Sequence, residues 1–175
     1  MSAVYLLLLL PLVSTQTFHW GGCPAPKVQP NFNLPRYGTN RTELMTRKCI
    51  EANYAFRKDG TIQVLTSRLR KDKVRVAEGT AVVQDQREPS RLGVSFSYFT
   101  PYSPYLVLTT DYTSLSVVYS CTSILNIFHY DYAWILGRSR FLPWETVRYA
   151  EELLTKEGID LYRMKPTDQT GCKDT

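Results

Sequence analysis

The sequence has few of the residues that metal binding or catalysis needs. It contains only two histidines, His19 and His129, and neither has a ligand partner at metal-site spacing. None of the four cysteines belongs to a Cys-x-x-Cys pair, so the sequence predicts no zinc site. No Ser-His-Asp set is indicated, because His19 lies in the N-terminal segment and His129 adjoins an apolar loop. We therefore expect no metal, no cofactor and no catalytic residue.

The chain also lacks a dense patch of basic charge. Its 21 Lys and Arg against 16 Asp and Glu give a net charge of +5, concentrated only mildly in the segment 68–75. A module that binds nucleic acid carries a denser basic patch or an aromatic RNP strand. The composition therefore argues against a nucleic-acid partner, whereas weak attraction to anionic membrane or glycan surfaces remains compatible with it.

The only long apolar run, Val4 to Val13, is too short to cross a bilayer. Small residues follow it, and the pattern predicts a secretory signal peptide over residues 1–15, although no Lys or Arg precedes the run. The remaining residues, 16–175, suit one well-cored domain in the extracellular space. An even number of cysteines forms disulfides there. Asn40-Arg41-Thr42 is a glycosylation sequon, which makes Asn40 a candidate glycan acceptor.

Apolar and polar residues alternate from Cys49 onward, which is typical of half-buried β-strands. Seven such segments are separated by short loops, and they span residues 49–56, 61–69, 74–83, 92–99, 105–112, 115–121 and 130–137. The short loops predict an up-and-down antiparallel arrangement. Closure removes the exposed edges of such a sheet, so we predict an all-β barrel of eight strands whose remaining strand lies upstream of Cys49.

The period changes at Pro143, after the last strand. Val147, Ala150 and Leu154 recur at helical spacing, and Gly158 suits the C-terminal end of a helix. The other face of this segment is charged. One flanking α-helix should therefore pack its apolar stripe on the outside of the barrel.

Strand parity predicts which side chains face the barrel interior. These are Tyr54, Phe56, Val64, Val94, Phe96, Tyr98, Tyr105, Val107, Tyr132 and Trp134. Aromatic rings with a few phenol hydroxyls suit an apolar cavity that orients a small ligand. A filled core would give the same pattern, so periodicity alone leaves both interpretations open.

Several collinear segments resemble the lipocalin family. They are FHWGGCPAPKVQPNF near the start, KCIEANY, TTDYTSLSVVYSC, FHYDYAWILGR and LPWETV. Thr110-Asp111-Tyr112 matches the second lipocalin motif, and Arg138 matches the third. The resemblance covers nearly the whole chain after the signal peptide. It implies an eight-stranded barrel with a flanking helix that transports small hydrophobic molecules.

The resemblance also implies roles for particular residues. It pairs Cys23 with Cys121 and Cys49 with Cys172, and it places Tyr54, Phe96, Tyr105 and Trp134 on the wall of the ligand cavity. The loop after the seventh strand carries Ile124, Leu125, Ile127 and Phe128 where a turn normally has Gly, Asn, Asp or Pro. In a lipocalin this loop lies at the open mouth. We expect these four side chains to contact a membrane or lipoprotein surface, with a lid over the mouth or an oligomer contact as alternatives.

One segment departs from the family pattern. Gly38-Thr39-Asn40 stands where lipocalins have Gly-x-Trp, and the stretch from Arg36 to Cys49 is about six or seven residues too short by comparison with the family. A truncated first strand is therefore expected. Splice variation, a gene-model error and true divergence would each produce this pattern.

Three functions follow from these observations. The leading one is a secreted carrier of a small hydrophobic ligand such as a fatty acid or a sterol. The second is a secreted module that binds a protein or receptor, with a vestigial cavity. The third, a lipocalin-type isomerase, needs a free cysteine thiolate, and the resemblance gives all four cysteines partners. The sequence specifies neither the exact ligand nor the oligomeric state.

Overall fold

A computed structural model describes residues 17–37, 41–43, 49–70, 73–97, 100–162, 164–166 and 168–172. The predicted signal peptide, the candidate acceptor Asn40 and the side chain of Tyr98 lie outside these residues. The described part contains nine strands and two helices. Their bounds are β1 Thr17–Trp20, α1 Leu34–Tyr37, β2 Arg41–Glu43, β3 Ile50–Phe56, β4 Ile62–Arg70, β5 Lys73–Val83, β6 Arg91–Ser95, β7 Ser103–Thr110, β8 Leu115–Ile124, β9 Phe128–Gly137 and α2 Trp144–Lys156.

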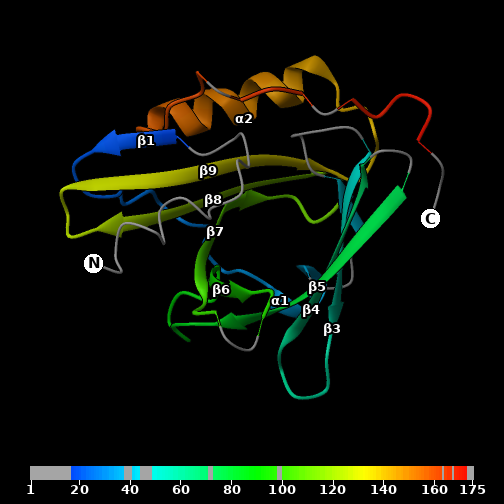
Figure 1. The fold of residues 1–175 in the computed structure, drawn as a ribbon, viewed down its shortest axis with the longest axis horizontal. Coiled ribbons are helices and arrows are strands. Elements are labelled where there is room, and N and C mark those ends of the chain that lie inside the picture. Colours follow the sequence, from blue (N-terminus) through cyan, green and yellow to red (C-terminus); the bar gives the residue numbers. More distant parts are fainter. Residues whose placement is uncertain are drawn as a thin grey trace, which may run out of the picture.

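The strands form one antiparallel sheet in which each strand from β2 to β9 pairs with the next (Figure 1). Among the described residues, the pair that joins β2 to β9 and completes the ring of eight is Glu43 with Gly137. The all-β fold of eight strands with a C-terminal helix is confirmed. Strand β2, the first of these eight, spans Arg41–Glu43 among the described residues, whereas Gly38-Thr39-Asn40 and residues 44–48 lie outside them, so the truncation of this strand stays a prediction.

All seven segments predicted from alternation form strands, with ends that shift by a few residues. The clearest shortening is in β6, which ends at Ser95 rather than at Phe99. Strand β1 was not expected from the sequence. This strand pairs with the first half of β9, from Thr17 opposite Asp131 to Trp20 opposite Phe128. The edge of β9 is therefore shared between β1 at one end and β2 at the other.

Apolar side chains form two clusters, one on each face of the sheet. The inner cluster gathers residues of β3 to β7 with the segment before β2, and includes Phe32, Tyr37, Tyr54, Ile62 and Val107. The outer cluster joins β8 and β9 to the helix α2. Strand β8 is buried from Leu115 to Cys121 because both of its faces are covered. Alternate side chains, beginning with Leu115, pack in the outer cluster, and the others face the interior.

Helix α2 packs its predicted stripe on the outside of the barrel. Ala150 and Leu154 are fully buried against β8 and β9, and Val147 is partly buried beside them. The helix ends where the sequence predicts, because Gly158 has a positive φ of 77° and donates its N–H to the carbonyl of Thr155. Ile159 then donates to Leu154, and its buried side chain joins the same cluster.

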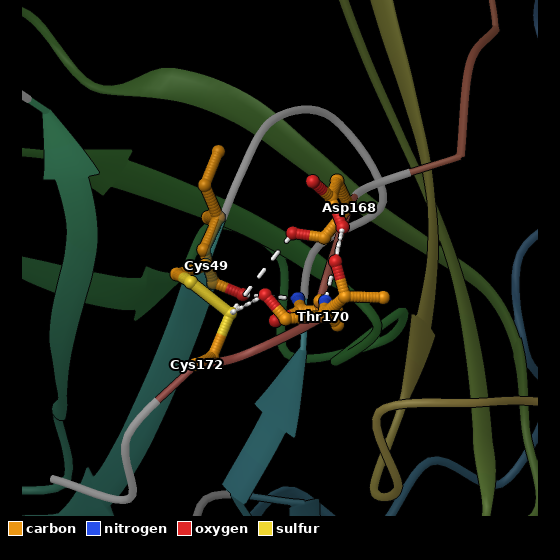
Figure 2. Close-up of a disulfide and its surroundings, with 6 residues drawn as sticks. Cys49, Asp168, Thr170 and Cys172 are labelled. Carbon is orange, nitrogen blue, oxygen red and sulfur yellow. Dashed lines mark hydrogen bonds between the residues drawn. A yellow bond between two sulfur atoms is a disulfide. The ribbon is translucent and has the colours of Figure 1, made fainter.

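Two disulfides tie the ends of the chain to the barrel. Cys23 bonds to Cys121 of β8, and Cys49, just before β3, bonds to Cys172 near the C-terminus, which is the pairing that the lipocalin resemblance implies. Figure 2 shows the second disulfide beside Asp168, whose carbonyl accepts the Cys49 N–H at 3.0 Å. The C-terminal segment therefore lies against the start of the sheet.

Because the strands are antiparallel, successive connections lie at alternate ends of the barrel. The last residues of β4, β6 and β8 lie at one end, which is the mouth of a lipocalin-type barrel. The connections 57–61, 84–90 and 111–114 lie at the other end. Among the described helices, none has the length and apolar composition that a membrane span requires.

Candidate ligand-binding interior and mouth

A chain of hydroxyl groups lies inside the barrel. The phenol oxygens of Tyr54 on β3 and Tyr105 on β7 are 2.8 Å apart, and Tyr105 is 3.2 Å from the phenol of Tyr37. Tyr37 continues the chain to Ser116 of β8 at 3.3 Å. Strand alternation turns Tyr54 and Tyr105 inward, and α1 places Tyr37 beside them. Polar groups inside an apolar core are thus satisfied by one another.

Stacked aromatic rings continue this wall toward the mouth. Tyr105 stacks on Trp134 with ring centroids 6.3 Å apart, and Trp134 stacks on Tyr132 at 5.6 Å. Trp134 lies opposite Val118, which in turn lies opposite the buried Val107, so all three share the inner face. Tyr105, Tyr132 and Trp134 are only partly buried although they face inward. Their exposed ring surface is available to an apolar ligand.

The phenols of this wall stay neutral over the physiological range. Burial, and the proximity of the other phenols, raise the pKa of Tyr37 and Tyr105 well above the usual 10. Burial also raises the pKa of Tyr132 to about 12. A neutral phenol both donates and accepts a hydrogen bond. The interior therefore offers apolar surface with uncharged polar groups that can orient a ligand.

The end opposite the mouth is filled by side chains. Phe32 and Tyr37 are buried there and pack on each other and near Tyr112, with ring centroids 5.1 and 6.1 Å from Phe32. The Tyr112 hydroxyl accepts the N–H of Asn33 at 2.8 Å, and the Arg36 guanidinium lies over the Tyr112 ring at 5.0 Å. The second lipocalin motif thus holds the segment that covers this end.

The predicted wall residues do not all meet. Tyr54, Tyr105 and Trp134 are connected as described, whereas Phe96 lies just beyond β6 at the mouth end and is 48% exposed. Its ring covers Gly79, where an added Cβ would come within 2.7 Å of the Phe96 ring. Of the other predicted inward residues, Val64 and Val107 are buried and Val94 is partly buried, but Phe56 is exposed. Ligand contact by these residues stays a prediction.

The apolar loop at the mouth is a tight turn. Leu125 and Asn126 both have positive φ, 53° and 56°, and Ile127 donates its N–H to the carbonyl of Ile124 at 3.1 Å. A positive φ is expected of Asn but is rare for a bulky residue such as Leu. The Leu125 side chain is 85% exposed at the tip. The turn therefore holds a large apolar side chain in water at a backbone cost.

Two further aromatic residues lie beside this loop, and the sequence analysis missed them. Phe18 and Trp20 of β1 are 60% and 87% exposed. Phe18 lies 6.4 Å from Phe128 between ring centroids, and Gly21 donates its N–H to the carbonyl of Ile127 at 2.7 Å. Only the pairing of β1 with β9 brings these residues to the mouth, so local sequence gave no signal for it.

The two histidines also meet, contrary to the premise of the sequence analysis. His19 of β1 lies directly opposite His129 of β9, and their rings stack with centroids 5.0 Å apart. Asp131 lies on the same face of β9, and one ligand atom from each of the three residues falls within 4.8 Å of the others. The structure thus brings together two histidines that the sequence placed in separate segments, while the expectation of no metal site stays untested. That expectation relied on sequence spacing, whereas strand pairing brings the residues together.

The barrel, its outer helix and its aromatic interior define a lipocalin. Residues 40–171 match the model of the lipocalin / cytosolic fatty-acid binding protein family. The chain belongs to this family. Insecticyanin of the tobacco hornworm Manduca sexta shares the fold, with a TM-score of 0.75 over 89% of this chain and 90% of its own at 20% sequence identity.

Within the family, the chain is similar to apolipoprotein D. The protein of that name from Oryctolagus cuniculus is 44% identical over 184 residues, which cover 97% of each chain. Apolipoprotein D from Cavia porcellus is also 44% identical, over 91% of this chain and 88% of its own. The resemblance predicted from the sequence is thereby confirmed.

Proposed function

We propose that this lipocalin is a secreted carrier of a small hydrophobic ligand. The observation that carries the proposal is the row of stacked, partly exposed rings of Tyr105, Trp134 and Tyr132 on the inner face of the barrel. Inward-facing aromatic surface that its neighbours leave partly uncovered is suited to an apolar guest. Membership of a family named for lipocalins and fatty-acid binding proteins supports the same function.

The chemistry of the wall favours a fatty acid, a sterol or a similar lipid. Such molecules combine a long apolar body with one or two polar groups. The apolar body would stack on Trp134, while a hydroxyl, carbonyl or carboxyl group would hydrogen-bond to the phenol hydroxyls of Tyr54 and Tyr105, which already lie 2.8 Å apart. We expect Phe96 to contribute from the rim.

Contact with a lipid surface is the second part of the proposal. Leu125, Ile127, Phe18 and Trp20 are 53% to 87% exposed at the mouth, beside the less exposed Ile124 and Phe128. Burying one large apolar side chain fully is worth about 1.5–3 kcal/mol, so this group can hold the mouth against a membrane or a lipoprotein particle. A ligand would then enter the barrel directly from the lipid phase.

Quenching of tryptophan fluorescence tests the carrier function. The chain has three tryptophans, of which Trp134 lies inside and Trp20 and Trp144 are exposed. Titration with a fatty acid or a sterol should quench the wild type saturably. Trp134→Phe should lose most of the quenching while retaining binding of a labelled ligand, and Trp144→Phe should behave like the wild type. Absence of saturable quenching in the wild type would contradict the proposal.

The alternative, a protein-binding module with a vestigial cavity, draws on one observation. In the part of the chain that the structure describes, one residue pair, Glu43 with Gly137, joins β2 to β9. Absence of quenching by fatty acids and sterols would favour this alternative. The isomerase chemistry has less support, because all four cysteines of the chain are in disulfides.

A further inference from the structure

We infer that His19, His129 and Asp131 form a binding site for a divalent transition-metal ion, Zn²⁺ in particular, on the outer face of the barrel. The site is distinct from the ligand interior, because Asp131 alternates with the inward-facing Tyr130 and Tyr132 along β9. His129 and Asp131 are two positions apart on this strand, so their side chains share a face. Strand β1 then places His19 directly opposite His129.

The hydrogen bond that His129 makes through Nδ1 leaves its Nε2 free to coordinate a metal ion. Its Nδ1 lies 2.9 Å from the carbonyl oxygen of Gly21. A carbonyl only accepts, so Nδ1 carries the proton, and the Nε2 lone pair of the neutral ring is available for coordination. A backbone carbonyl that binds the second ring nitrogen is the usual outer-shell partner of a metal-bound histidine. Because His129 is buried, this tautomer is held in place.

The other two ligands are oriented in a similar way. The Tyr119 hydroxyl donates to one Asp131 carboxylate oxygen at 2.8 Å, which leaves the second oxygen, Oδ1, facing His19. His19 Nε2 is buried, lies 3.6 Å from Oδ1 and has no hydrogen-bond partner among the described residues. Two ligands of one tetrahedral zinc ion lie roughly 3.3–3.5 Å apart, given Zn–N and Zn–O bonds of about 2.0–2.2 Å. A small movement would therefore bring this pair to bonding distance of one ion.

The cluster is held together covalently and is accessible from solvent. Cys23, four residues after His19, is bonded to Cys121, and Cys121 lies opposite Asp131 in the sheet. This disulfide fixes β1 on β9, which is the preorganisation that a metal site needs. The His19 side chain is 27% exposed although its Nε2 is buried, so the ion would enter on the side of this ring. A bound ion would also join β1 to the barrel.

Zinc titration of the full chain, expressed without a polyhistidine tag, tests the site. Calorimetry should show one Zn²⁺ per chain, and the same single equivalent should shift the NMR signals of both imidazoles together. These are the only histidines in the sequence, so their signals are unambiguous. Co²⁺ should give the visible absorption of a tetrahedral complex. Failure of either imidazole to respond to Zn²⁺ in the wild type would overturn the inference.

Variants give a second, independent readout. His19→Gln, His129→Gln and Asp131→Asn should each weaken Zn²⁺ binding at least tenfold, and Tyr119→Phe should weaken it about tenfold while leaving the stoichiometry unchanged. Asp160→Asn, on an exposed carboxylate after α2, is the matched control and should bind like the wild type. Equal affinity in the three ligand variants and the wild type would show that Zn²⁺ binds elsewhere. Lipid binding in the interior is a separate measurement, which none of these outcomes decides.

Discussion

The carboxylate of Asp111 organises the turn between β7 and β8. It accepts the backbone N–H groups of Thr113, Ser114 and Leu115 at 2.7 to 2.9 Å. Partial burial favours a higher pKa for Asp111, but these donors outweigh that effect and leave its pKa well below the usual range. Asp111 of the second lipocalin motif thus stabilises this turn in its ionised form.

Replacement of this residue should change the pH dependence of stability. A carboxyl group whose pKa is lowered by folding contributes its full stability above its unfolded pKa of about 3.9, and this contribution declines progressively as the pH falls from that value through the lower pKa of the folded state. Asp111→Asn should therefore lower the free energy of unfolding at pH 7, on the order of 1 kcal/mol. Urea denaturation at pH 7 and pH 3 measures this difference. A deficit as large at pH 3 as at pH 7 would contradict the electrostatic explanation.

The paired phenols make a second prediction at the scale of single residues. Tyr105→Phe removes the hydroxyl that joins Tyr37 to Tyr54, while the ring that stacks on Trp134 is retained. Loss of one net hydrogen bond corresponds to about 0.5–1.5 kcal/mol, so affinity for a fatty acid or sterol should fall about 2- to 13-fold. A competition assay with a fluorescent lipid measures this change. Tyr102→Phe, at an exposed tyrosine, should have no effect.

Strand parity predicted the common face of Tyr54 and Tyr105 but not the exposure of Phe56 and Phe96 at the strand ends. Tyr54 and Tyr105 were expected on one face and lie together in the inner cluster. Tyr37 was missed because it belongs to a single helical turn whose position depends on tertiary contacts. His19 and His129 were judged separate for the same reason, since only the pairing of β1 with β9 connects them.

At the scale of elements, the β8–β9 hairpin combines exposure with an unfavourable backbone. The left-handed conformation costs an ordinary residue about 1–2 kcal/mol, and Leu125 adopts it at the tip. Strain retained at an exposed apolar residue is a pointer to function. The hairpin is visible as the turn that joins β8 and β9 in Figure 1.

Two substitutions at Leu125 separate stability from lipid binding. Leu125→Gly relieves the backbone conformation, so it should be about 1 kcal/mol more stable than Leu125→Ala in urea denaturation. Both variants remove the same apolar surface and should bind vesicles of anionic lipid equally weakly compared with the wild type. If Leu125→Ala were as stable as Leu125→Gly, the turn would not be strained.

Flotation with liposomes tests the hairpin as a docking element. The double variant Leu125→Asp, Phe128→Asp places two charges at the mouth and should remain in the aqueous fraction, because charge is costly to bury in lipid. Wild-type protein should float with the vesicles. Val76→Asp, on an exposed valine of β5, is a control for charge alone. Equal flotation of the double variant and the wild type would end the docking proposal.

Element boundaries were predicted unevenly for physical reasons. Gly158 and the amphipathic stripe of α2 are local signals, and the helix ends where they indicate. Strand β6 is shorter than its alternation suggests, because the chain turns after Ser95 and Phe96 folds over Gly79. Alternation of polar and apolar residues indicates which side chains face solvent, but it does not indicate the residue at which hydrogen bonding between strands ends. The four-residue β1 is too short to give a periodic signal.

For the whole molecule, the two disulfides close large loops. Their cysteines are 98 and 123 residues apart in sequence. In the chain-entropy model, a loop of this size stabilises the folded state by about 4–5 kcal/mol, and the two loops differ by only a few tenths of a kcal/mol because the dependence on length is logarithmic. Removal of either bridge is therefore expected to have a similar effect.

Paired serine variants measure this contribution. Cys23→Ser with Cys121→Ser, and Cys49→Ser with Cys172→Ser, should each lower the free energy of unfolding by about 4–5 kcal/mol. Denaturation by guanidinium chloride, followed by circular dichroism, gives both values on one scale. A negligible loss in the second variant would show that the contacts in Figure 2, such as Cys49 N–H to Asp168, hold the C-terminal segment without the bond.

The overlap of the two bridges along the chain has a topological consequence. Cys23–Cys121 and Cys49–Cys172 interleave, so the second begins before the first has closed. Hydrolysis of any one peptide bond between Cys23 and Cys172 leaves two fragments that are still covalently joined. A protease that cuts once in this region would therefore nick the molecule without dividing it, and the fragments would separate on a gel only after reduction.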